Sequence, residues 1–140
     1  MNRQILNSVM LAGALLLPAV ASAEVVVVVN PSVSVSGSLD DVANLFLGKS
    51  SALAGVSLTP VDQEEGSDVR EEFYQKAAGK SQAQLNAYWS RIVFTGKGQP
   101  PRAAGDDDAI KEAIAKNKTL IGYIDSDSLD SSVKKVISVK

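Results

Sequence analysis

The sequence contains no cysteine and no histidine. Without these residues the chain cannot assemble a Ser-His-Asp or Cys-His catalytic arrangement, nor the soft-ligand sites that zinc and copper prefer. It also cannot form disulfides, so an exported form of the protein must rely on its core alone. No pair of carboxylates stands in a recognisable catalytic context. We therefore expect a protein that is not an enzyme, with no catalytic residues, no metal site and no cofactor.

The sequence also lacks a strong charge of either sign. It has 14 basic and 16 acidic residues in 140, and removal of residues 1–23 leaves a net charge of −3. Nucleic-acid binding favours a basic surface, so this balance predicts no nucleic-acid partner. It gives no reason to expect attraction to anionic lipid.

Residues 1–23 have the pattern of a Sec signal peptide. Arg3 gives a basic start, Val9–Leu17 an apolar run, and Ala21-Ser22-Ala23 a small-residue cleavage site. The apolar run is shorter than the roughly 20 residues that a membrane-spanning helix needs. A lipoprotein would need a cysteine at the cleavage point. We expect cleavage after Ala23, export to the periplasm, and a single domain over residues 24–140.

Beyond the signal, the chain alternates between predicted strands and helices. The five valines Val25–Val29 predict a strand buried on both faces, as in a parallel sheet covered by helices. Capping residues and apolar spacing predict four helices, which begin after Ser38, near Asp68, after Ser81 and at Asp106. Further strands are expected at residues 56–61, 119–124 and 133–139, with a loop at 96–105. This order predicts a single three-layer α/β domain with a largely parallel sheet.

The best candidate site is the junction Gly66-Ser67-Asp68, with Arg70 one turn into the following helix. Unpaired N–H groups at a helix start, with the helix dipole behind them, favour an anion. Gly66 would allow close approach of the backbone, Ser67 could donate its hydroxyl hydrogen, and the Arg70 guanidinium suits an oxyanion. The alternative is that Ser67 or Asp68 only caps the helix.

Three other motifs have simpler interpretations. Gly48-Lys49-Ser50 imitates the end of a phosphate loop, but Ala43 stands where that pattern needs a glycine. Asp106-Asp107-Asp108 fits either a hard-cation site or a helix cap followed by two acids that the dipole favours. Trp89 fits either core packing or stacking on a ligand, and its helical spacing favours the core.

Four segments in a fixed order carry a resemblance to a known family. The segments are Phe46-Leu47-Gly48-Lys49, residues 61–70, Tyr88–Gly98, and Leu120–Ile124. Together they resemble the type II periplasmic-binding fold, in particular the phosphate-binding subunits of ABC importers, reduced to about one lobe. The resemblance implies an exported, non-enzymatic solute-binding protein that takes phosphate or a related oxyanion in connection with phosphate ABC transport. It implies that Ser67 contacts the ligand, with Gly66 and the following amides beside it.

Two departures from the family leave a second hypothesis open. Acidic residues Asp62, Glu64 and Glu65 precede the candidate serine, and the family's Ser-Gly-Thr run is replaced by Ser67-Asp68-Val69. A single lobe also leaves half of a small ligand in water. A homodimer would supply the missing wall. Alternatively, the chain is a periplasmic interaction or accessory protein that docks an envelope or membrane protein without solute capture.

Overall fold

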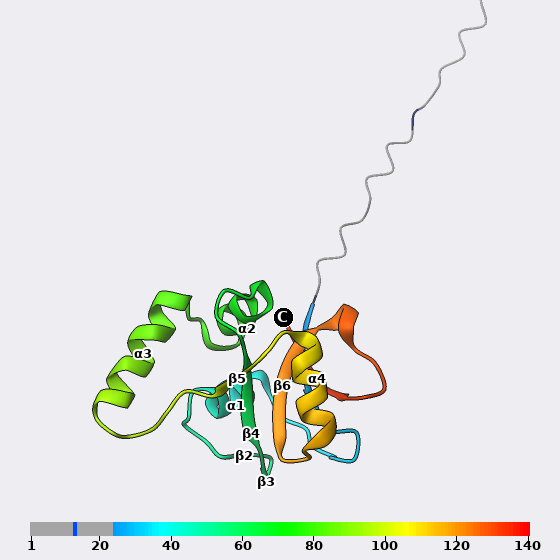
Figure 1. The fold of residues 1–140 in the computed structure, drawn as a ribbon, viewed down its shortest axis with the longest axis horizontal. Coiled ribbons are helices and arrows are strands. Elements are labelled where there is room, and N and C mark those ends of the chain that lie inside the picture. The colour runs from blue at the N-terminus through cyan, green and yellow to red at the C-terminus, as the bar shows by residue number, and fades with distance from the viewer. Residues whose placement is uncertain (1–12, 14–23) are drawn as a thin grey trace, which may run out of the picture.

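The structure is a computed structural model that describes residue 13 and residues 24–140. The rest of the predicted signal peptide, residues 1–12 and 14–23, lies outside the described residues. Within the described part, none of the helices has the length and apolar character needed to span a membrane. These residues form a central sheet with helices on both faces (Figure 1).

The main sheet has five strands in the order β5-β4-β6-β1-β7. Strand β4 is parallel to β5 and β6, and β1 is antiparallel to both β6 and β7. Four strands therefore run in one direction, which confirms a mixed, largely parallel α/β sheet. The strands span β1 Val25–Val29, β4 Thr59–Gln63, β5 Arg102–Gly105, β6 Leu120–Asp125 and β7 Lys134–Val139.

The direction of β1 differs from the prediction. All five valines are buried, as expected, but the strand runs opposite to both neighbours rather than parallel to them. An unbroken apolar run reports burial on both faces, because each face is covered by helices whichever way the strand runs. It carries no information about strand direction.

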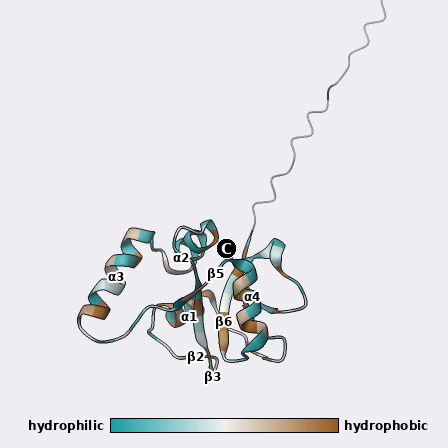
Figure 2. Cartoon of the chain, viewed as in Figure 1, coloured by the Kyte–Doolittle hydropathy of each residue, from teal (hydrophilic) through white to brown (hydrophobic). Residues whose placement is uncertain are grey.

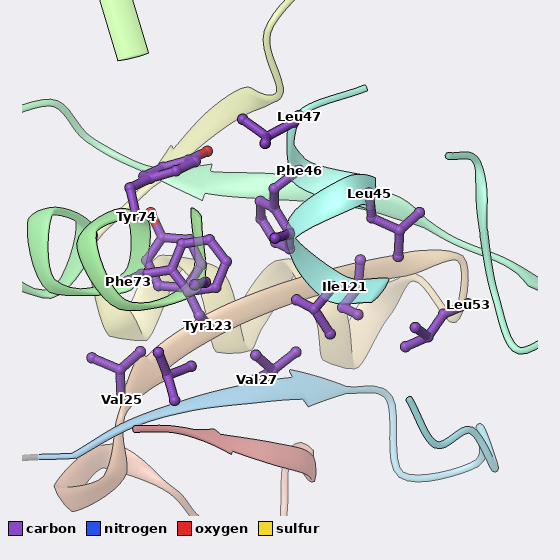
Figure 3. Close-up of a cluster of buried hydrophobic side chains, with 14 of the residues drawn as sticks. Val25, Val27, Leu45, Phe46, Leu47, Leu53, Phe73, Tyr74, Ile121 and Tyr123 are labelled. Atoms are coloured by element: carbon purple, nitrogen blue, oxygen red, sulfur yellow. The ribbon is translucent and has the colours of Figure 1, made fainter. Parts of the chain in front are cut away.

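The helices are α1 (Leu39–Phe46), α2 (Asp68–Ala78), α3 (Gln82–Phe94) and α4 (Asp107–Lys116). Helices α1 and α2 pack with Val25, Val27 and Val29 on one face of the sheet, while α4 packs with Val26 and Val28 on the other. This arrangement confirms the three-layer domain. Figure 3 shows the larger core, where aromatic rings of α1 and α2 meet β6.

The helix boundaries follow the local signals closely. Ser38 and Ser81 each form a complete capping box at the starts of α1 and α3, and α2 begins at Asp68, as predicted. Asp106 is the N-cap of α4, which supports the capping interpretation of the three aspartates. Helix α3 projects away from the sheet (Figure 1).

Two strand predictions needed revision. The segment predicted as one strand at 56–61 is divided between β3 (Val56–Ser57), which forms a hairpin with β2 (Ala52–Leu53), and β4. Strand β5 lies inside the region predicted as a loop. Pro60 is paired with Ile121 of β6, but it has no partner in β5, because the pairing of β4 with β5 begins at Val61. The proline therefore sits where its missing N–H costs no ladder bond to β5.

Gly122 allows α4 to lie close against the sheet. A Cβ atom at this position would lie 2.8 Å from the Ile110 side chain and 3.1 Å from that of Ile114, both on α4. Because α4 is held close to β6, its N-terminus also lies near the end of β4, where the candidate site is found.

Candidate binding site at the ends of the parallel strands

The start of α2 is formed by Gly66 and Ser67. Gly66 has φ +94°, and a Cβ there would meet nothing, so glycine is needed for backbone conformation rather than for close contact. The Ser67 hydroxyl accepts a hydrogen bond from the Arg70 amide at 3.2 Å and donates to Gln63 Oε1 at 2.7 Å. Ser67, rather than Asp68, is therefore the N-cap of this helix.

The first turn of α2 keeps open backbone donors. The Ser67 amide bonds to the Glu64 carbonyl, and the Glu71 amide bonds to the Ser67 carbonyl. Among the residues that the structure describes, no acceptor is bonded to the amides of Asp68 and Val69, as is usual for the first turn of a helix. The Asp68 side chain is exposed. These two N–H groups are the donors that remain for an anion.

A shallow hollow of about 340 Å³ lies beside this turn, and we call it the strand-end hollow. It sits at the carboxyl ends of β4 and β6, between the first turns of α2 and α4. In open α/β sheets, ligands bind at this edge. Its lining residues are Gln63, Ser67, Val69, Asp106, Asp107, Asp108 and Ser128.

The Asp107 carboxylate accepts several hydrogen bonds within the strand-end hollow. Asp107 Oδ1 accepts from Gln63 Nε2 at 2.6 Å, and Asp107 Oδ2 accepts from Ser128 Oγ at 2.7 Å and from the Asp125 amide at 3.3 Å. These are donors of the kind that would otherwise bind an oxyanion. A ligand anion must therefore use the open amides and face the negative charge of Asp107.

The side chain of Arg70 is turned away from the strand-end hollow. Its Nη1 donates to the Gln63 carbonyl at 2.8 Å and lies 3.8 Å from Asp62 Oδ2, on the inner side of α2. Its guanidinium does not line the strand-end hollow but a second hollow between α2 and α3. Of the four predicted site residues, Gly66, Ser67 and Asp68 are thus brought together at the start of α2, and Arg70 faces elsewhere.

A buried polar cluster explains why Arg70 turns inward. Asp62 was expected in the loop before α2, but it lies inside β4 and accepts hydrogen bonds from the hydroxyls of Tyr74 and Tyr123. Burial raises the pKa of the Asp62 carboxyl, although the bonds from Tyr123 and Tyr74 and the charge of Arg70 act in the opposite direction. Because an isolated buried carboxylate is costly, the guanidinium is drawn toward it.

Sequence reasoning missed Gln63, Asp107 and Ser128. Asp107 lies in the acidic run that was predicted to be either a hard-cation site or a helix cap, and Gln63 lies beyond the strand that was predicted to end at residue 61. The signal that could have found Gln63 is its position just beyond the carboxyl end of a predicted strand and shortly before a helix start. Among the described residues, no group of three or more acidic side chains is arranged to hold a metal ion.

Comparison with solved structures gives the fold its class. The chain matches an ABC-type phosphate transport receptor from Vibrio cholerae with a TM-score of 0.64 at 18% identity, over 81% of this chain and 45% of that one. It matches a Clostridium perfringens structure described as a phosphate ABC transporter substrate-binding protein with bound phosphate, with a TM-score of 0.60 at 21% identity. That match covers 81% of this chain and 44% of the other.

A third match is PstS from Borrelia burgdorferi, with a TM-score of 0.60 at 10% identity, over 81% of this chain and 46% of that one. The chain thus spans less than half the length of the binding proteins it matches, which agrees with a single lobe of that fold. No protein-family model matches the sequence, and no curated protein matches it. The identities are low, so the likeness shows the fold alone.

Proposed function

We propose that this protein is an exported, non-enzymatic binding protein that takes a small oxyanion, phosphate by resemblance, in connection with phosphate ABC transport. The observation that carries the proposal is the strand-end hollow, where the first turns of α2 and α4 meet at the carboxyl ends of β4 and β6. Each helix start places partial positive charge and open N–H groups beside the same space. Matched structures that are named as phosphate-binding proteins support the choice of ligand.

The geometry predicts weak binding by one copy. The donors at the start of α2 are the amides of Asp68 and Val69, because Ser67 already donates its hydroxyl hydrogen to Gln63, and Arg70 is engaged with Asp62. The carboxylates of Asp106, Asp107 and Asp108 line the same hollow and oppose an anion. We expect dissociation constants in the millimolar range, where the net binding free energy is about −4 kcal/mol.

The experiment is a titration followed by backbone amide NMR. The protein purified from the periplasm is titrated with phosphate, sulfate and molybdate at constant ionic strength, with chloride as the control. Saturable shifts of the Gly66–Val69 amides with phosphate, absent with chloride, are the expected result. A folded protein whose amides do not respond at tens of millimolar of any of the three oxyanions would contradict the proposal.

A second candidate function has its own support. The side chains of Gln63 and Ser128 already donate hydrogen bonds to Asp107, and Arg70 donates to the Gln63 carbonyl. Many of the donors that an anion would use are therefore bonded to other residues of the chain. This arrangement favours an accessory protein that keeps the lobe as a scaffold and docks an envelope or membrane protein. The same titration separates the two, because the scaffold predicts no saturable response.

A further inference from the structure

A second hollow lies between α2 and α3, and we call it the α2–α3 hollow. It measures about 580 Å³ and is separate from the strand-end hollow. One stripe of α3 forms its outer wall, with Trp89, Val93 and Phe94, while Arg70 and Pro100 line it from the body of the domain. With Asn86 and Ser90, which also line the hollow, these α3 residues follow the i, i+3, i+4, i+7, i+8 spacing of one helix face.

The far end of α3 exposes a large apolar side chain beside this hollow. Phe94 is 92% exposed and Val93 is 48% exposed, whereas the remaining large exposed hydrophobic residue of the described chain, Leu129, is 37% exposed. Figure 2 shows the apolar colour at this end of α3, where the helix stands apart from the sheet. An exposed phenylalanine next to a hollow lined by tryptophan and proline is typical of an interaction surface.

Both buried donors without partners in the described chain border the α2–α3 hollow. Arg70 Nε and Trp89 Nε1 are shielded from solvent and have no acceptor. Trp89 is only 8% exposed. Buried N–H groups are nearly always paired, so two orphans beside one hollow show that the packing of α3 against the domain is incomplete at this point.

The segments around the hollow carry opposite charges. The segment that contains α3 and the following loop, residues 81–105, has Arg91, Lys97 and Arg102 and no acidic residue. The opposite side has exposed Glu64 and Glu65, and Glu65 lines the hollow itself. A surface with both signs side by side is complementary to itself after a two-fold rotation.

We propose that the α2–α3 hollow binds a second copy of this chain, with Phe94 of each copy in the hollow of the other. The basic α3 segment of one copy then faces Glu65 of its partner. Two copies together have about the length of one of the matched two-lobed proteins. The inference does not rest on the anion site, because it uses a different surface.

The test is the oligomeric state of the periplasmic protein by sedimentation equilibrium between 1 and 500 µM. A concentration-dependent dimer is expected for the unchanged protein. Phe94→Ser should raise the dimer dissociation constant at least tenfold without altering the melting temperature of the monomer, since this side chain is almost fully exposed. Leu129→Ser is the matched control and should leave the dissociation constant unchanged.

A charge exchange tests the orientation of the pair. Glu65→Lys should weaken the dimer, and combining it with Lys97→Glu should restore part of the lost affinity. A strict monomer at 500 µM, or an unchanged dissociation constant in Phe94→Ser, would overturn the proposal. The anion titration repeated on Phe94→Ser keeps the two proposals apart, because loss of the dimer alone does not remove the open amides of α2.

Discussion

Phe73 on α2 and Tyr123 on β6 stack face to face, with ring centroids 4.0 Å apart and ring planes 7° apart. Figure 3 shows the pair at the centre of the larger core, where Phe46 meets both rings. The Tyr123 hydroxyl, beyond the stacked rings, donates a hydrogen bond to Asp62. This contact fixes α2 on the sheet and so determines where the first turn of α2 lies.

Loss of this stack should destabilise the domain strongly. Phe73 is fully buried, so Phe73→Ala removes a core ring and leaves a cavity, at an expected cost of about 3–5 kcal/mol in the free energy of unfolding. Urea unfolding followed by circular dichroism measures this cost. Phe94→Ala, the same change at an exposed position, is the control and should alter the unfolding free energy by less than about 0.5 kcal/mol. Similar costs for the two variants would contradict the described packing.

Ser67→Ala separates capping from binding. The change removes the N-cap of α2 and should lower stability by about 1 kcal/mol. If the hydroxyl also contacts the anion, affinity should fall by about 0.5–1.5 kcal/mol, or more if the acceptor is a charged oxygen. Ser81→Ala removes the N-cap of α3 and is the matched control, with a similar loss of stability and unchanged anion affinity. Preserved affinity in Ser67→Ala would show that Ser67 is only a cap.

Asp107→Asn tests the electrostatic opposition in the strand-end hollow. Removing this negative charge should strengthen oxyanion binding about tenfold, because two like charges about 4 Å apart repel by roughly 1–4 kcal/mol in water-like to surface-like surroundings. Asp130→Asn removes a carboxylate that bonds to Lys111 outside this hollow and serves as the charge control. NMR or calorimetric titration with sulfate measures both. Equal affinities in the two variants would argue against an anion in this hollow.

The raised pKa of Asp62 makes a prediction about pH. A carboxyl group that takes up its proton more readily when folded contributes stability below its unfolded pKa, about 3.9, and loses it as the pH rises through the folded value. Asp62→Asn abolishes this titration. The unfolding free energy of the variant minus that of the unchanged protein should therefore increase between pH 3.5 and pH 7. A difference independent of pH would mean that burial does not govern this group.

Gly122→Ala tests the close approach of α4 to the sheet. The new methyl group would lie 2.8 Å from Ile110, so the helix must shift, and we expect a loss of about 1–3 kcal/mol in unfolding free energy. Gly98→Ala is the control, because the nearest atom to its Cβ, in Ile92, lies at 3.4 Å. Thermal unfolding compares the two variants. An unchanged melting temperature for Gly122→Ala would contradict the described packing of α4.

Local signals in the sequence predicted much of this fold. Ser38, Ser67 and Ser81 each cap a helix through atoms within three residues, so the helix starts could be placed from the sequence. Strand β5 was missed because its pairing with β4 depends on residues about 40 positions away. The antiparallel direction of β1 depends in the same way on distant partners.

The candidate site was predicted in part for the same reason. The turn at Gly66 and Ser67 is local, and it lies where it was expected. The orientation of Arg70 is set by Asp62, whose burial depends on tyrosines from α2 and β6. The partners of Asp107 come from β4, the end of β6 and Ser128. Such convergence of distant segments leaves no local pattern in the sequence.

The five-valine strand β1 pairs with two strands that come about 100 residues later in the sequence, β6 and β7, since Val25 pairs with Asp125 and with Val139. A ribosome releases this strand well before either of its partners. Until then, the most apolar segment of the domain has two open edges, which are prone to pair with other chains. Native folding must therefore wait for β6 and β7, so a chaperone that holds the unfinished chain should raise the yield, and proteolytic loss of β7 should promote aggregation.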